Sequence, residues 1–245
     1  MREVTLLEML QKGVHFGHQE SRWNPKMDQY IFTSRNGIHI INLESTLAKL
    51  QAAAVFAQTV GKGGGNVLFV GTKRQAKDIV RRAAEDCGMP FAVERWIGGT
   101  LTNFSTIHEL IKKLRRLKSE KSVGLFEKYT KKERLSFQDE IEKLQRDIGG
   151  MEYMDTLPAA LFVVDAAKER TAVREARKMN IPIIAMCDTN ANPDAVQYAI
   201  PANDDATKSI DLVATVLAEA IAEGKKLMPA TAPAAAPAVP ATPTV

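Results

Sequence analysis

The chain has 245 residues, of which 45% are hydrophobic, so it can bury a sizeable core and is neither a disordered protein nor a disulfide-stabilised peptide. Its two cysteines, Cys87 and Cys187, lie in apolar stretches, which is typical of a reducing environment. No apolar run reaches the roughly 18 residues that a membrane span needs. The sequence after Met1 also lacks the layout of a signal peptide. We therefore expect a soluble, cytoplasmic protein without a membrane partner.

The formal net charge is +4, but it is unevenly distributed along the chain. Residues 1–150 carry a net charge of +8, and residues 151–245 carry −4. Such an asymmetry favours the binding of a polyanion by one part of the molecule.

Apolar runs and helical spacing alternate over much of the chain. Short apolar, β-rich runs predict strands at 67–71 and 161–165, a continuous apolar run predicts one at 181–188, and 38–43 and 92–97 are further candidates. Helical spacing predicts helices at 47–60, after residue 71, between residue 165 and Arg177, and at 210–223. This alternation is typical of an α/β fold, a doubly wound and mainly parallel sheet flanked by helices.

The segment 103–150 interrupts the alternation. Apolar residues recur at three- and four-residue spacing in 107–117 and again in 137–148, and Gly149 and Gly150 end the second run. We predict an inserted antiparallel coiled-coil hairpin that projects from a single discontinuous α/β domain made of 1–102 and 151–228. The alternative is a packed helix pair without partners. The segment 229–245 holds five prolines and seven alanines, which predicts a disordered tail.

Several motifs have the composition of an RNA-binding surface. Cations alternate with aromatic residues in the segment 22–35, which suits phosphate contacts and base stacking, although the aromatics could equally anchor a hairpin. The segment 71–74 could hold a backbone phosphate where a strand meets a helix, and Lys73, Lys77 and Arg81 would extend a positive stripe at i, i+4 and i+8. The loop 95–103 could face RNA, form an active site, or act as a hinge to the hairpin.

Metal binding and catalysis have weaker support. His15 and His18 are three residues apart but have no nearby cysteine, and a metal site needs further ligands. Asp165 and Asp188 end apolar runs and, with the Asp204–Asp205 pair, might hold a cation. No nucleophile–base pair accompanies them. We expect neither an enzyme nor a bound cofactor or metal, although the histidines and aspartates leave a metal open.

Six long motifs together resemble one family, the bacterial form of the small-ribosomal-subunit protein S-two. The resemblance covers about residues 1–228. The motifs are Gly-Val-His-Phe-Gly-His at 13–18, Arg-Trp-Asn-Pro-Lys-Met at 22–27, Arg-Asn-Gly-Ile-His-Ile-Ile-Asn-Leu at 35–43, Val-Gly-Thr-Lys-Arg-Gln-Ala at 70–76, Arg-Trp-Ile-Gly-Gly-Thr-Leu-Thr-Asn at 95–103, and Ile-Ala-Met-Cys-Asp-Thr-Asn-Ala-Asn-Pro at 184–193.

The resemblance implies a structural constituent of the small (30S) ribosomal subunit, with an α/β domain and an inserted coiled coil. It implies binding to small-subunit (16S) ribosomal RNA and to neighbouring ribosomal proteins, support for the attachment of ribosomal protein S-one, and no homo-oligomer. The RNA-binding candidates are Arg22, Trp23, Lys26, Arg35, Thr72, Lys73, Arg74, Lys77, Arg81, Arg95, Thr100 and Asn103. The protein-contact candidates are Lys112, Arg115, Arg116, Lys131 and Lys132. The alternative is an α/β enzyme or sensor that binds a phosphorylated small molecule at 71–74 and 98–100.

Overall fold

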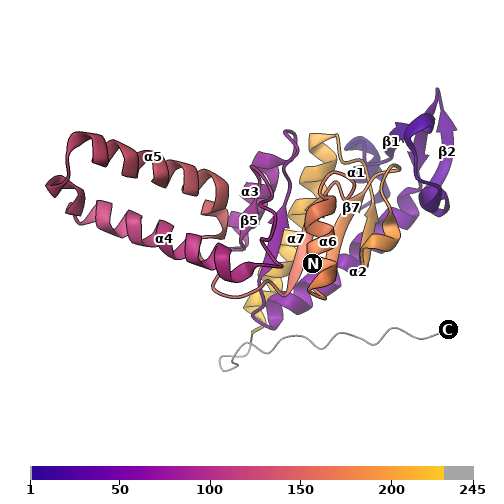
Figure 1. The fold of residues 1–245 in the computed structure, drawn as a ribbon. Helices are drawn as coiled ribbons and strands as arrows, with labels where there is room; N and C mark the ends of the chain where they lie inside the picture. Colours follow the sequence, from indigo (N-terminus) through magenta and orange to yellow (C-terminus); the bar gives the residue numbers. More distant parts are fainter. Residues whose placement is uncertain (1, 229–245) are drawn as a thin grey trace.

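The computed structural model describes residues 2–228, and its centre is a five-stranded sheet in which every neighbouring pair is parallel (Figure 1). Continuous apolar runs form the strands because both faces of the sheet are covered. In spatial order the strands are β5 (Phe91–Ala92), β4 (Val67–Val70), β6 (Ala160–Val164), β7 (Ile183–Cys187) and β8 (Tyr198–Pro201). The predicted α/β fold with a mainly parallel sheet is confirmed.

Helices cover the two faces of this sheet, and alternate residues of each strand point to opposite faces. In β6, Phe162 and Val164 belong to one apolar cluster, whereas Leu161 and Val163 belong to the other. The first face is covered by α1 (Leu6–Gln11), α2 (Leu43–Lys62), α3 (Lys77–Asp86) and α7 (Thr207–Lys226). The second face is covered by α6 (Arg170–Lys178) and by the start of α4 (Phe104–Ser122).

Helices α2 and α7 approach closely because glycines lie at their crossing. A Cβ atom on Gly224 would lie 2.2 Å from the carbonyl oxygen of Gln58, and one on Gly61 would lie 2.5 Å from the carbonyl oxygen of Ile221. The contact therefore depends on the absence of side chains at these two positions. It fixes the helical layer under the first face of the sheet.

The predicted strand 38–43 does not join the main sheet. It forms β3 (Ile38–Ile41), which pairs antiparallel with β1 (Phe16–Gln19) and β2 (Ile31–Arg35) in a separate three-stranded sheet. Asn36 and Gly37 have φ values of 55° and 74°, and two such residues form the tight turn that joins antiparallel strands. The short helices η1 (Glu20–Arg22) and η2 (Pro25–Tyr30) connect β1 to β2.

Two further boundaries differ from the sequence prediction. The strand expected at 92–97 shrinks to the two residues of β5, because the following backbone turns into a loop that is bonded to α6. Helix α3 begins at Lys77, after a turn at 73–76, so Lys73 lies outside it. Strand β8 was not predicted from the sequence. It follows the short helix η5 (Pro193–Ala195) and precedes α7.

The segment between β5 and β6 is helical, as predicted, and projects away from the sheet (Figure 1). Helix α4 runs outward, η3 (Leu125–Lys128) turns the chain, and α5 (Lys131–Ile148) returns to η4 (Gly149–Met151). Leu114 and Ile141 are buried between the helices, and the rings of Phe126 and Phe137 stack at a centroid distance of 5.0 Å near the tip. Coiled-coil packing and the division into domains stay predictions.

The predicted tail at 229–245 lies outside the described residues. Among the helices formed by residues 2–228, none combines the length and the apolar character that a membrane crossing requires.

Candidate functional site

The strand order of the main sheet reverses between β4 and β6. The chain leaves β4 toward one edge of the sheet, to β5, and later continues from β6 toward the other edge, to β7 and β8. Ligands of doubly wound folds gather where the order reverses in this way. The backbone amide and the hydroxyl of Thr72, after β4, both donate to the buried carboxylate of Glu169, after β6. The two loops are therefore held together.

Lys73 extends from this junction into a group of carboxylates. Its Nζ lies 2.6 Å from Asp204 Oδ1, 2.7 Å from Asp205 Oδ1 and 3.3 Å from Asp165 Oδ2. Burial alone would lower the pKa of Lys73, but the hydrogen bond and charge of Asp204 outweigh it, and the pKa is raised. The ammonium group is therefore a permanent counter-ion of this cluster.

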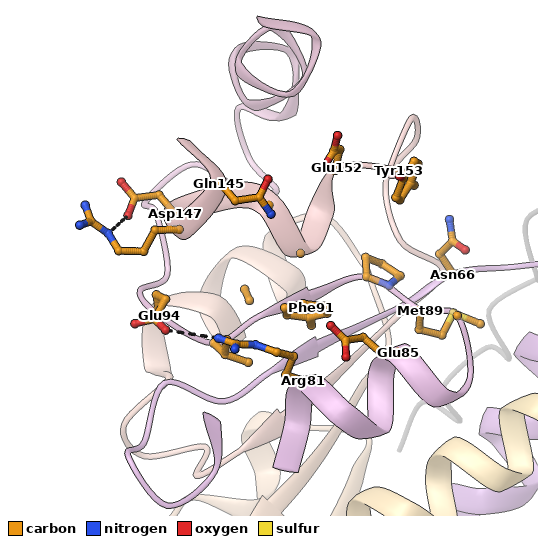
Figure 2. Close-up of a pocket in the computed structure, with 17 residues that line it drawn as sticks. Asn66, Arg81, Glu85, Met89, Phe91, Glu94, Gln145, Asp147, Glu152 and Tyr153 are labelled. Atoms are coloured by element: carbon orange, nitrogen blue, oxygen red, sulfur yellow. Dashed lines mark hydrogen bonds and ion pairs between the residues drawn. The ribbon is translucent and has the colours of Figure 1, made fainter. Parts of the chain in front are cut away.

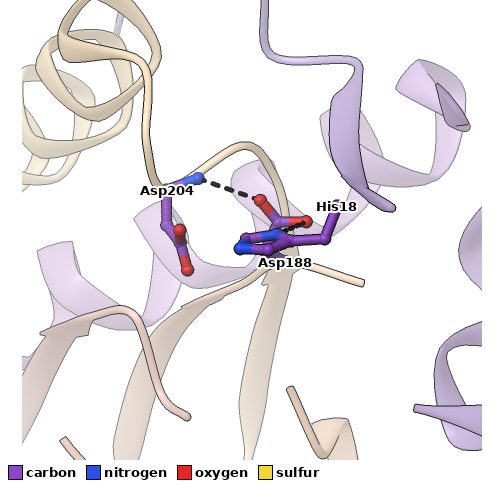
Figure 3. Close-up of side chains that lie close together, drawn as sticks. All are labelled: His18, Asp188 and Asp204. Carbon is purple, nitrogen blue, oxygen red and sulfur yellow. Dashed lines mark hydrogen bonds and ion pairs between the residues drawn. The ribbon is translucent and has the colours of Figure 1, made fainter. Parts of the chain in front are cut away.

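His18, from β1, completes the cluster on the other side (Figure 3). Its Nδ1 lies 3.0 Å from Oδ1 of Asp188, and its Nε2 lies 3.6 Å from Oδ2 of Asp205. The hydrogen bond to Asp188 raises the pKa of His18, partly offset by burial and supported by the charges of Asp204 and Asp205. The contacts of His18 with Asp188 and Asp205 therefore tie the small N-terminal sheet to the carboxyl edge of the main sheet.

His18, Asp188 and Asp204 could also hold a divalent cation. Each offers one ligand atom, and the three atoms lie within 4.8 Å of one another. One imidazole and two carboxylates suit zinc or a similar ion with further positions open. Oδ2 of the fully buried Asp204 has no hydrogen-bond partner among residues 2–228. Burial, with the charges of Asp165 and Asp188, raises the pKa of Asp204 to about 7. Of the two histidines considered from the sequence, only His18 belongs to this group, and His15 does not.

The predicted positive stripe is not a free cationic surface. Lys73 points into the carboxylate cluster, while Nζ of Lys77 lies 2.5 Å from Glu94 and a guanidinium nitrogen of Arg81 lies 3.5 Å from the same carboxylate. Glu94 lies two residues after β5 and eight residues after the end of α3, so helical spacing in the sequence could not relate it to Lys77 and Arg81. Arg74 is exposed and has no ion-pair partner among residues 2–228.

The loop 95–103 is built around Glu175 of α6, which the sequence reading missed. Glu175 Oε1 accepts from the Trp96 indole at 3.0 Å and from the amide of Gly99 at 2.8 Å. Oε2 accepts from the amide of Leu101 at 3.0 Å and from the amide and hydroxyl of Thr102, each at 3.2 Å. One buried carboxylate therefore fixes the loop that leads into the hairpin. In the sequence, the only sign of this role is that Glu175 is a single glutamate between apolar positions of a predicted helix.

The RNA-binding candidates on this loop have different environments. Arg95 is exposed and has no charge partner in the described part of the chain. Thr100 is fully buried, and its hydroxyl donates to the carbonyl of Ile97. Asn103 is exposed at the start of α4 and accepts from the Ser105 hydroxyl. Arg95 and Asn103 are thus available to a ligand, and Thr100 is not.

The N-terminal candidates surround the small antiparallel sheet. Arg22 and Arg35 are exposed, and Trp23 is 37% exposed with its ring 5.3 Å from the ring of His39. Lys26 pairs with Asp194 at 2.5 Å, so its charge is compensated. Three of these four side chains therefore remain open to a partner.

The protein-contact candidates on the hairpin also divide into paired and unpaired cations. Arg115 pairs with Asp155 at 2.8 Å at the root, and Lys112 and Arg116 pair along α4 with Glu109 and Glu120. Lys131 and Lys132 are exposed at the start of α5 and lack such partners within residues 2–228.

A pocket of about 680 Å³ lies between edge strand β5 and the root of the hairpin (Figure 2). Four carboxylates line it against two arginines, and both arginines are already paired, Arg81 with Glu94 and Arg146 with Asp147. A phosphorylated ligand would meet net negative charge there. The pocket also lies apart from the segments 71–74 and 98–100, which the alternative function would use.

Comparisons with known proteins agree with the resemblance noted in the sequence. A family model described as Ribosomal protein S2 matches residues 9–224. The small ribosomal subunit protein uS2 of Mycobacteroides abscessus is 51% identical over 224 residues, which is 91% of this chain and 81% of that protein. The family match includes the main sheet, the hairpin and the ion cluster described above. The chain therefore belongs to the ribosomal protein S2 family.

Proposed function

We infer that membership of this family gives the protein a structural role in the ribosome, as a component of the small subunit in the cytoplasm. Beyond this, we propose that the protein binds small-subunit ribosomal RNA and neighbouring ribosomal proteins, that it supports the attachment of ribosomal protein S-one, and that it acts without catalysis or self-association. The proposal rests on one observation about the protein's surface. Some exposed arginines have no carboxylate partner among residues 2–228, and exposed apolar side chains lie on the small antiparallel sheet.

The unpaired cations support RNA binding. Arg22, Arg35, Arg74 and Arg95 are exposed and have no carboxylate partner among residues 2–228. Arginine forms two parallel hydrogen bonds with a phosphate and also stacks on bases. Arg22 and Arg35 belong to the small-sheet region, and Arg74 and Arg95 lie in loops after β4 and β5 of the main sheet. RNA contacts would therefore be spread over the α/β body rather than confined to one stripe.

Exposed apolar side chains on the small antiparallel sheet support attachment of a protein. Phe32 is 74% exposed, Phe16 is 47% exposed and Ile38 is 37% exposed, and each lies on a different strand of this sheet. Aromatic residues such as phenylalanine are enriched at protein–protein contacts. We therefore assign the S-one contact to this sheet, with the hairpin cations Lys131 and Lys132 as candidates for other protein contacts.

The alternative enzyme or sensor is less favourable. Its proposed phosphate donors are already bonded to carboxylates: Thr72 donates to Glu169, and Lys73 contacts Asp204 and Asp205. A phosphate would have to displace these acids before it could bind.

Reconstitution tests the proposed function. Small subunits stripped of this protein and of S-one are incubated with the wild-type chain and then with S-one, and both proteins are quantified after sedimentation. We expect Phe16→Ala combined with Phe32→Ala to leave the chain on the subunit but to reduce the recovery of S-one. Val55→Ala, which removes an exposed apolar side chain from α2, is the control. Normal S-one recovery with the double variant would contradict the assignment to the small sheet.

A further inference from the structure

Helix α6 lies on the second face of the sheet (Figure 1). Its exposed side carries a row of cations. Arg170, Arg174, Arg177 and Lys178 occupy positions i, i+4, i+7 and i+8, so they share one side of the helix over about 12 Å. All four are exposed, and so is Lys168 in the turn before the helix. The opposite side of α6 packs on the sheet through Ala172, Val173 and Ala176.

We call the side chains of Arg170, Arg174, Arg177 and Lys178 the α6 basic face. They have no carboxylate partner in the part of the chain that the structure describes. The acids closest to them in sequence point inward. Glu169 is buried and accepts from Thr72, and Glu175 is buried and accepts from the loop 95–103. The α6 basic face therefore differs from the predicted stripe on α3, where Glu94 compensates both Lys77 and Arg81.

Helix stability does not explain this arrangement. Arg177 and Lys178 lie in the last turn, where cations are favourable for the helix dipole, but Arg170 is the first helical residue, where a cation is unfavourable. Arg170 and Arg174, and again Arg174 and Lys178, are like charges at i and i+4, which repel each other. The helix retains these charges although they weaken it, which points to a role in binding an anion.

We propose that the α6 basic face binds the phosphate backbone of small-subunit ribosomal RNA. This inference rests on the proposed RNA-binding function and assigns it a location. Phosphate groups recur regularly along a nucleic-acid strand, and a row of guanidinium groups can neutralise several of them together. Glu175 ties the loop of Arg95 to the same helix, so Arg95 extends the positive surface beside α6.

A pair of matched variants tests the location. One variant changes the α6 basic face to glutamine at all four positions. The control changes four exposed and unpaired lysines of α2 and α7, on the other face of the sheet, to glutamine: Lys49, Lys62, Lys208 and Lys226. Both variants lower the formal net charge from +4 to zero, so any difference between them reflects position and not total charge.

The probe is a small ribosomal subunit stripped of this protein, and binding is measured by sedimentation at several salt concentrations. Each lost phosphate contact removes about 0.7 to 0.9 from the slope of log affinity against log salt, so we expect the α6 variant to lose about 3 units of slope and about tenfold or more in affinity at low salt. The control should keep the wild-type slope. Equal losses in both variants would overturn the proposal.

A second measurement identifies the partner directly. Arg174→Cys, labelled with a short photo-cross-linker, retains the other three cations and is used in the same subunits. We expect cross-links to ribosomal RNA. Cross-links only to ribosomal proteins would overturn the proposal, even if the fourfold variant proved too unstable to assay. If the wild-type chain itself failed to bind stripped subunits, the proposed function would fail, and this result is distinct from a failure of the α6 assignment alone.

Discussion

Glu175 provides a sharp test of how the fold positions the loop 95–103. Glu175→Gln keeps the shape of the side chain but replaces one carboxylate oxygen with an NH₂ group. Whichever way the amide is oriented, two of the four N–H donors that now bond Glu175 then face another donor: either Leu101 and Thr102, or Trp96 and Gly99. Leaving a buried donor unsatisfied costs about 1–3 kcal/mol, so we expect the free energy of unfolding to fall by about 2–6 kcal/mol.

The effect should depend on pH in a predictable direction. Burial alone would raise the pKa of Glu175, but the hydrogen bonds from Gly99, Trp96, Leu101 and Thr102 outweigh it and lower the pKa below its ordinary value of 4.5. A carboxyl group with a lowered pKa in the folded state stabilises the protein above its unfolded pKa and loses this contribution as the pH falls through the folded pKa. The stability gap between wild type and Glu175→Gln should therefore be constant near neutral pH and narrow below about pH 4.5.

Urea unfolding followed by tryptophan fluorescence measures this gap. The chain has two tryptophans, so a Trp23→Phe background leaves Trp96, whose indole donates to Glu175, as the reporter. Glu219→Gln on α7 removes an exposed carboxylate and should change stability by less than about 0.5 kcal/mol. A loss for Glu175→Gln no greater than that of this control, or a gap that persists unchanged at acid pH, would refute the reasoning.

Two further substitutions test the helix layer and the ion cluster. Gly224→Ala should destabilise the fold by about 1–3 kcal/mol because its Cβ would lie 2.2 Å from the Gln58 carbonyl oxygen, whereas Gly98→Ala, with no atom within 4 Å, should be tolerated; thermal melting compares them. Lys73→Met should cost about 3–5 kcal/mol in urea unfolding at neutral pH, because it leaves the buried Asp204 without its counter-ion. If Lys73→Met left the free energy of unfolding almost unchanged, the carboxylates would be sharing protons instead of depending on Lys73.

The sequence predicted the sheet well where one physical signal dominates. Runs such as 161–165 and 181–188 are apolar at consecutive positions, and only a strand covered on both faces suits such a pattern. The segment 92–97 carries a weaker signal, and only Ala92 of it lies in a strand, since its continuation is bonded to Glu175, about 80 residues later in the chain. Local pattern cannot reveal such a distant acceptor. Similarly, the Asn36–Gly37 turn, and not strand propensity, decides that β3 pairs with β2.

Charge is where sequence reasoning is weakest, because the compensation of charges depends on which side chains meet in space. The segment 151–245 has a net charge of −4, which points away from RNA, and the stripe through Lys73, Lys77 and Arg81 points toward it. Folding reverses both expectations. Acids of the C-terminal segment take part in the carboxylate cluster and in hydrogen bonds with loops, as with Asp204 and Glu175, whereas the α6 cations are exposed and have no carboxylate partner among residues 2–228. The potential that a polyanion meets is set by charges that remain exposed and uncompensated, so a net-acidic segment can still present a basic face.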